Sequence, residues 1–138
     1  MKAVNPYLNF NGNTEEAFNF YKSVFGGEFQ IFMRMKDAEG MPVPAGQEEK
    51  IMHIALPLNN GTVLMASDNC NEASFNQGNN FYISIHTENV EEGHRLYDAL
   101  ADGGKPDHSF KKEFWGDWHG NLTDRFGVKW MLNYSENQ

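Results

Sequence analysis

His53 is the most informative of the five histidines in this 138-residue sequence. It lies within residues 51–58, where apolar and other side chains alternate as in a strand with one buried face. On the opposite face an imidazole can bind a metal, act as a general base or hydrogen-bond to a ligand. A hydrogen-bonding role in a metal-free pocket is the favoured interpretation. A purely structural histidine is the alternative.

Other segments show the same alternation, and we expect their more apolar face to pack under helices. The opposite faces combine polar groups, aromatic rings and sulfur, which is typical of a sheet that curves around a ligand pocket. A solvated face with a few satisfied polar groups is the alternative. The side chains on these faces are Tyr7, Asn9, His53, Ala55, Tyr82, Ser84, His86, Met131 and Asn133.

An aromatic-rich segment at residues 114–120 places Trp115 and Trp118 on either side of a Gly-Asp pair. These rings either stack on a planar or aliphatic ligand or fill the core. His108 and His119 belong to the same region. A metal site would require them to gather with His53 or His86, and the sequence alone does not place them together.

Charge and cysteine content narrow the classes of partner. Acidic residues outnumber basic ones 19 to 11, giving a net charge of −8, which argues against nucleic acid or an anionic membrane. The single cysteine, Cys70, lies among acidic residues that oppose thiolate formation, so a nucleophilic role is not expected. One cysteine and no signal-like or membrane-spanning apolar run favour the cytoplasm.

An internal repeat predicts how these side chains are positioned. The residues from Asn13 to Tyr21 align with those from Asn89 to Tyr97, 76 positions later, with Asn, Glu, Glu and Tyr in register. Both segments have apolar residues at helical spacing and are followed by a Gly pair, with Gly26 and Gly103 placed to end the helices. The offset indicates two copies of one unit; chance similarity between two amphipathic helices is the alternative.

Strand signals surround each predicted helix, so each half reads as a strand, a helix and three strands. We expect one α+β domain over 1–138, with modules of about 1–75 and 76–138, and loops at 36–49 and 68–79. The Asp124-to-Gly127 segment predicts a hairpin turn with Gly127 at positive φ. The expected strands are 7–10, 28–35, 51–58, 62–67, 80–87, 108–114, 118–123 and 128–134.

Several segments, in this order and spacing, resemble PhnB-like proteins of the vicinal oxygen chelate (glyoxalase/bleomycin resistance/dioxygenase) superfamily. This resemblance implies two βαβββ modules whose mixed sheets form an open cup with helices on its outer face, and a homodimer. The segments are residues 7–13, Glu16-Ala17, Phe20-Tyr21, residues 25–27, 51–55, 64–68 and, most specifically, 122–133.

The resemblance also implies four positions at which superfamily enzymes hold a divalent metal. They fall near Pro6 or Tyr7, on His53, on Tyr82 and on Met131. Only His53 is a common ligand, and one such donor does not hold a hard divalent cation. No metal and no cofactor are therefore expected.

The leading hypothesis is a protein that binds a small molecule in a metal-free cup. Aromatic rings and Met131 would supply apolar contact, and amide, imidazole and hydroxyl groups would orient polar atoms of the ligand. A metal-dependent or His53-assisted lyase or isomerase is one alternative, and a drug-sequestering resistance protein is another. The expected ligand-binding residues are Tyr7, Asn9, His53, Tyr82, Trp115 and Met131.

Overall fold

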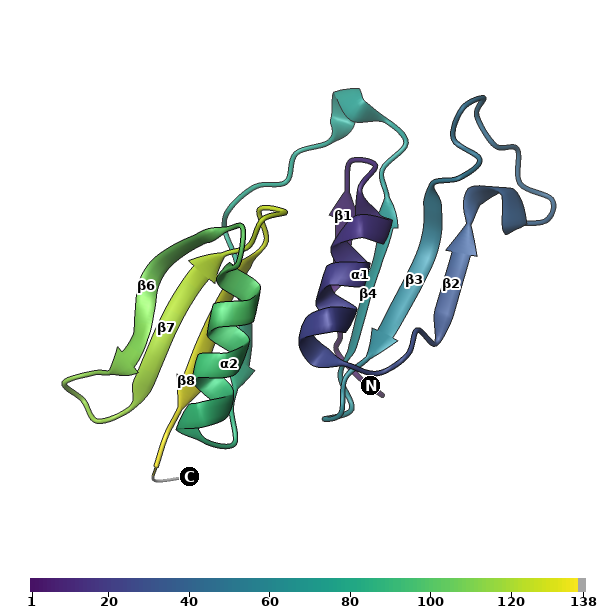
Figure 1. Ribbon diagram of the computed structural model, residues 1–138. Helices are drawn as coiled ribbons and strands as arrows, with labels where there is room; N and C mark the ends of the chain where they lie inside the picture. Colours follow the sequence, from purple (N-terminus) through teal and green to yellow (C-terminus); the bar gives the residue numbers. More distant parts are fainter. Residues whose placement is uncertain (137–138) are drawn as a thin grey trace. The chain divides into compact units, whose positions relative to one another are not determined.

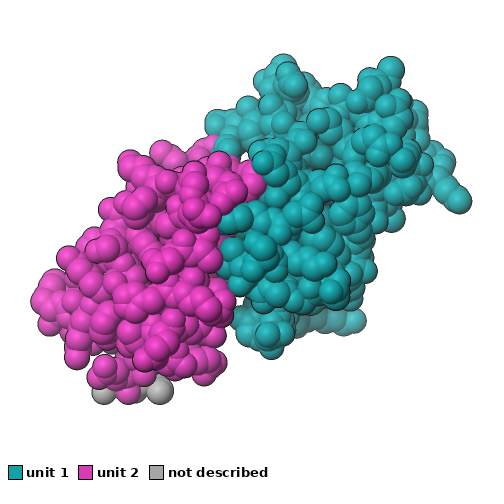
Figure 2. Space-filling view, viewed as in Figure 1, with its two compact units in different colours: residues 1–77 teal, residues 78–138 magenta. Residues whose placement is uncertain are grey.

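The computed structural model describes residues 1–136 and divides into two compact units, residues 1–77 and 78–138 (Figures 1 and 2). Each unit contains one helix and one open four-stranded sheet in the order strand, helix, three strands. The predicted α+β architecture of two βαβββ modules is confirmed.

In unit 1 the strand order is β1-β4-β3-β2, with β1 parallel to β4 and the other pairs antiparallel. A short 3₁₀ helix, Met35–Asp37, begins at the last residue of the expected strand 28–35 and continues into the predicted loop 36–49. A second one, Glu72–Ser74, lies in the predicted loop 68–79. The elements are β1 (Tyr7–Phe10), α1 (Thr14–Phe25), β2 (Ile31–Arg34), β3 (Ile51–Pro57) and β4 (Val63–Asp68).

Unit 2 repeats this topology with the order β5-β8-β7-β6, and β5 is parallel to β8. Its strand bounds differ from the predicted ones. β5 is shorter than expected, and β6 begins before His108 because Lys105 and Pro106 already pair with Thr123 and Leu122. The elements are β5 (Ile83–His86), α2 (Val90–Ala101), β6 (Lys105–Lys112), β7 (Trp118–Thr123) and β8 (Lys129–Tyr134).

The core of unit 1 lies between α1 and one face of its sheet. Phe18 and Tyr21 of α1 are fully buried and meet edge to face, with ring centroids 5.4 Å apart. The alternation predicted this face well, although Met52 is only half-buried. The buried sheet residues are Leu8, Phe10, Ile51, Ile54, Leu56, Leu64 and Ala66.

Unit 2 packs α2 on the corresponding face of its own sheet. Trp130, Leu132 and Leu122 are buried there, as Leu96 and Leu100 are on the helix. Phe81, expected on the buried face, is instead 52% exposed because the strand begins only at Ile83. The two helices of the repeat differ at one corresponding buried position. Gly93 occupies the position of the buried Ala17 because a Cβ there would lie 2.3 Å from Cζ of Phe110.

The two helices begin with different caps. Asn89 accepts a hydrogen bond from the Glu92 amide at 2.8 Å, which satisfies one of the free N–H groups of α2. Asn13 makes no such side-chain bond. The Thr14 amide instead donates to Oδ1 of Asp68 at 3.0 Å, so the cap of α1 comes from the end of β4. Local sequence does not reveal a cap supplied by another strand.

Two buried carboxylates join backbone segments. Asp68 accepts from the amide and hydroxyl of Thr14 and, through Oδ2, from the Ile51 amide at 2.8 Å. Asp124 accepts from the amides of Phe126 and Val128 and from Nε1 of Trp130 at 2.9 Å. The predicted turn from Asp124 to Gly127 is confirmed, with Gly127 at φ 82°. Asp124 therefore has a structural role in this turn.

Neither helix in the described part of the chain combines the length and apolar character that crossing a membrane requires.

Replacement of Asp124 tests the role of its carboxylate. Asp124→Asn should lower the free energy of unfolding by about 1–3 kcal/mol. The carboxylate accepts from two backbone N–H groups through one oxygen and from the indole N–H through the other, whereas an amide has only one oxygen that accepts. Urea denaturation followed by far-UV circular dichroism measures the change. Asp102→Asn, which removes an exposed ion pair with Arg125, is the matched control and should cost less than about 1 kcal/mol. Equal losses in both variants would contradict this assignment.

Candidate functional site

The face of each sheet opposite its helix, here called the helix-free face, carries four of the six predicted site residues. In unit 1, Tyr7 pairs with Met65 and Asn9 with Ser67 across β1 and β4. His53 of β3 projects to the same side because Ile54 beside it is buried under α1. The sheet therefore brings three of the six predicted residues together: Tyr7, Asn9 and His53.

Tyr7 and His53 form a defined pair across the intervening strand β4. Their rings stack with centroids 5.6 Å apart and an interplanar angle of 13°. The Tyr7 hydroxyl lies 3.3 Å from Nδ1 of His53, within hydrogen-bonding distance. Tyr7 is nevertheless 49% exposed. The pair is thus preoriented and open to a ligand.

Polar and apolar groups flank this pair. Nδ2 of Asn9 donates to the Ser67 hydroxyl at 3.5 Å, a weak bond that a ligand can replace. Met33 of β2 lies directly opposite His53 and is 37% exposed. Met side chains adapt to irregular apolar surfaces. The face therefore offers adaptable apolar contact beside groups that can orient polar atoms.

Met131 lies on the helix-free face of unit 2, between Ser84 and Asn121 in the strand register. A chain of hydrogen bonds joins this row to the next one, in which His119 lies opposite Asn133. Nδ1 of His119 lies 2.8 Å from Oδ1 of Asn133, and Nδ2 of Asn133 donates to the Ser84 hydroxyl at 3.3 Å. Nδ2 of Asn121 lies 3.3 Å from Nε2 of His119. These contacts hold the His119 ring through both of its nitrogens.

His108 extends this cluster toward the loop between β6 and β7. Its ring lies 5.8 Å from that of His119, and its Nε2 is hydrogen-bonded to Oε1 of Glu113. This bond lowers the pKa of the Glu113 carboxyl below its usual value of 4.5, because it stabilises the charged form. The cluster thus contains a carboxylate that remains ionised in mildly acidic solution.

The remaining predicted residues occupy separate places in unit 2. Tyr82 precedes β5, is 39% exposed and stacks under the Lys129 ammonium, 4.9 Å from the ring centroid. Trp115 lies in the turn between β6 and β7, is 55% exposed and contacts Phe114 edge to face. Trp118, in contrast, packs against His94 and Phe110 on the helix side. Of the two tryptophans in this segment, only Trp118 contributes to the core.

The side chains do not fit the divalent metal that the superfamily resemblance implies. Within residues 1–136, no group of three or more His, Cys, Asp or Glu side chains is arranged to hold a metal ion. His108, His119 and Glu113 lie near one another, and their side chains make hydrogen bonds to each other or to Asn121 and Asn133. These three side chains therefore do not form a metal site of the superfamily kind.

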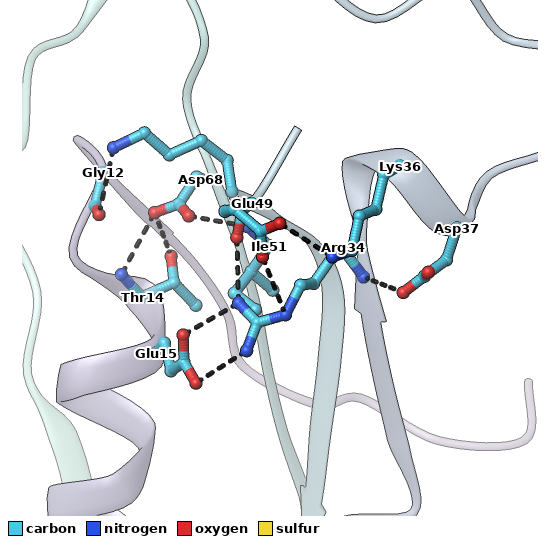
Figure 3. A network of polar contacts seen from close by, with 10 residues as sticks. Gly12, Thr14, Glu15, Arg34, Lys36, Asp37, Glu49, Ile51 and Asp68 are labelled. Atoms are coloured by element: carbon cyan, nitrogen blue, oxygen red, sulfur yellow. Dashed lines mark hydrogen bonds and ion pairs between the residues drawn. The ribbon is translucent and has the colours of Figure 1, made fainter. Parts of the chain in front are cut away.

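A pocket of about 460 Å³ lies elsewhere in unit 1, and none of the six predicted residues lines it. Charged side chains line it, including Glu15, Arg34, Glu49 and Lys50. Figure 3 shows the contacts that join Glu15, Arg34 and Glu49. Arg34 forms a two-pronged ion pair with Glu15, at 2.9 Å for both contacts. This hydrogen-bonded pair lowers the pKa of Glu15 and raises that of Arg34.

Sequence reasoning missed the roles of Ser67, Asn121 and Glu113. Ser67 and Asn121 lie at alternate positions of strands that were predicted, so extending the alternation to β4 and β7 identifies them. No comparable signal exists for Glu113. It lies in a turn and reaches His108 because the register of β6 is irregular.

These features define an α+β protein of the glyoxalase-like fold. The crystal structure of a glyoxalase/bleomycin resistance protein/dioxygenase family enzyme from Burkholderia phytofirmans PsJN shares that fold, with a TM-score of 0.60 at 17% identity over 93% of this chain and 95% of that one. The family model described as 3-demethylubiquinone-9 3-methyltransferase matches residues 2–133. The chain belongs to this family, and the predicted PhnB-like identity within the vicinal oxygen chelate superfamily is confirmed.

Two solved structures are more similar in sequence. Protein PA1353 from Pseudomonas aeruginosa is 39% identical, with a TM-score of 0.84 and 96% of each chain covered. A PhnB protein from Bacillus cereus, which carries the same methyltransferase description, is 28% identical, with a TM-score of 0.78 over 96% of this chain and 98% of that one.

The lowered pKa of Glu113 predicts a pH dependence of stability. A carboxyl whose pKa is lower in the folded state stabilises the fold above its unfolded pKa, and this contribution disappears as pH falls through the folded value. The stability difference between the native protein and Glu113→Gln should therefore be largest above about pH 4.5 and shrink below it. Urea denaturation across pH 3 to 6 measures it, using ~0.5-unit steps.

Glu91→Gln, which removes one charge from an exposed position on α2, is the matched control for net charge. A difference between Glu113→Gln and the native protein that does not change with pH, or that matches the Glu91→Gln result, would contradict the assigned pairing with His108.

Proposed function

We propose that this protein binds a small organic molecule on the helix-free faces of its sheets, without a metal ion in the site. The observation that carries the proposal is the Tyr7–His53 pair. A fixed aromatic surface with polar atoms at its edge can stack on a planar or aliphatic ligand and also orient it by hydrogen bonds.

The proposed roles follow from side-chain chemistry. Tyr7, Tyr82, Trp115 and Met131 would provide apolar contact, and each of these three aromatic rings is at least 39% exposed. Asn9, His53 and the Tyr82 hydroxyl would hydrogen-bond to polar atoms of the ligand.

The polar chain on the helix-free face of unit 2 supports the same proposal. His119 is held from both sides by Asn133 and Asn121, so its ring orientation is fixed before any ligand arrives. Preorganised polar groups lose little freedom on binding, which favours affinity. We therefore add Asn133 and Ser84 to the groups proposed to contact the ligand.

A His53-assisted lyase or isomerase is the second candidate, and one observation favours it. The Tyr7 hydroxyl engages Nδ1, whereas Nε2 of His53 makes no hydrogen bond within the described residues. An imidazole held through one nitrogen can accept a proton at the other. Conversion of a bound ligand to a product, abolished in His53→Ala, would distinguish this enzyme from a simple binding protein.

Methyl transfer, named in the family description, is not part of the proposal. A nucleotide-type methyl-donor site uses a Gly-rich turn that leads from a strand into a helix N-terminus. The Gly26-Gly27 and Gly103-Gly104 pairs instead follow α1 and α2, and Gly26 caps α1 by donating to the carbonyl of Lys22 at 2.8 Å.

We also propose a homodimer, as the family resemblance implies, and a cytoplasmic location, which the single cysteine favours. β2 lies at the edge of its sheet and exposes Ile31 and Met33, each by 37%, so its apolar surface and free backbone groups suit association. Sedimentation equilibrium should give twice the mass of the chain. A monomer at all concentrations tested would contradict this part of the proposal.

A ligand screen by thermal shift tests the site. A ligand at 100 times its dissociation constant stabilises the folded state by about 2.7 kcal/mol, so hits should raise the melting temperature by several degrees. Tyr7→Ala and His53→Ala should weaken each hit by about tenfold or more, because one hydrogen bond and one stacking contact are lost.

Phe32→Ala is the matched control for Tyr7→Ala. Phe32 is a similarly exposed ring of unit 1, at 40%, but it lies beside the buried Ile54 and so on the helix side of the sheet. It should leave the affinity unchanged. Unaltered affinity in both Tyr7→Ala and His53→Ala would contradict the site assignment.

A further inference from the structure

The charged pocket of unit 1 provides a second site, independent of the helix-free faces. It is about 460 Å³ in volume and includes Gly12, Glu15, Glu49, Lys50 and Asp68 in its lining. From its charges we propose that it binds a small carboxylic acid that also carries a hydroxyl or ammonium group. The ligand's carboxylate would contact the Lys50 ammonium.

The acidic groups of the pocket already accept hydrogen bonds from other residues of unit 1. Glu15 is paired with Arg34, and Glu49 accepts from Nζ of Lys36 at 2.7 Å. Asp68 accepts three hydrogen bonds from the Thr14 amide and hydroxyl and the Ile51 amide (Figure 3). Each of these carboxylates therefore has hydrogen-bond donors within unit 1, although the donors to Asp68 are all uncharged.

Lys50 differs from these groups. Its ammonium carries three donors, but its hydrogen bond to the carbonyl of Gly12 is long, at 3.4 Å. No carboxylate of the described chain lies within ion-pair distance of it, whereas Lys22 and Lys36 both have such partners. Lys50 is thus a partly buried cation, at the rim of a pocket, with donors available for an anion.

Gly12 makes room for this ammonium. Its φ of 98° is a conformation that other residues rarely adopt, and a Cβ at this position would lie 2.7 Å from Nζ of Lys50. The glycine therefore permits both the turn between β1 and α1 and the close approach of the lysine.

The surrounding acids determine the class of ligand. One carboxylate can pair with Lys50, but a second negative charge would lie near Glu15, Glu49 and Asp68 and be repelled. Remaining lone pairs of Glu49 can instead accept from a hydroxyl or an ammonium group. A hydroxy acid or an amino acid satisfies both conditions, whereas a phosphate dianion does not.

Nuclear magnetic resonance titration of the full-length protein tests the proposal with L-lactate and L-serine as probes and inorganic phosphate as the comparison. L-Lactate or L-serine should shift the backbone amides of Gly12 and Ile51, and phosphate should bind more weakly. Lys50→Gln should weaken binding of these probes by about tenfold or more, since a charge-assisted hydrogen bond is lost.

Lys22→Gln is the matched control, because Lys22 is a lysine of the same unit that pairs with Glu28 and does not line the pocket. It should bind the probes as the native protein does. Unmoved amides of Gly12 and Ile51 in the native protein would overturn the proposal, and this result does not depend on how any variant folds. Unchanged affinity in Lys50→Gln, or tighter binding of phosphate than of both organic acids, would also overturn it.

Discussion

The structure depends on one constraint: each four-stranded sheet has a single α-helix packed on it, and that helix covers only one of the two faces. Burial of apolar surface stabilises the covered face, where Phe18, Tyr21, Trp130 and Leu132 are all at least 99% buried. The opposite face is free of that requirement and carries tyrosine, histidine, asparagine and methionine. Most of the groups proposed to bind a ligand therefore lie on the face that the helix does not cover.

Two buried carboxylates fix the ends of the elements that form these layers. Asp68 fastens the start of α1 to the start of β3, and Asp124 closes the β7–β8 turn onto the Trp130 indole. Each satisfies backbone donors that would otherwise be buried without partners, a costly arrangement.

The fold could be predicted from the sequence because its signals are local: period-two alternation, two helical stripes and a repeat. The Tyr7, Asn9 and His53 cluster followed from the same alternation. The His108–Glu113 contact could not be predicted. In a regular strand, His108 and Phe110 would share the buried face. The register shift between His108 and Lys111 separates them, so that His108 lies beside His119 instead. The Asp68 cap and the Lys50 pocket were also beyond prediction, because each joins segments distant in sequence.

The central claim is that the helix-free faces bind a small molecule without a metal. The most direct measurement is chemical-shift mapping of a ligand from the thermal-shift screen on chelator-treated protein, with metal content checked by mass spectrometry. We expect chemical-shift changes at Tyr7, His53 and Ser67 in metal-free protein. Binding that occurs only after Mn, Fe, Ni or Zn is added back, or shifts confined to the helix side of the sheets, would contradict it.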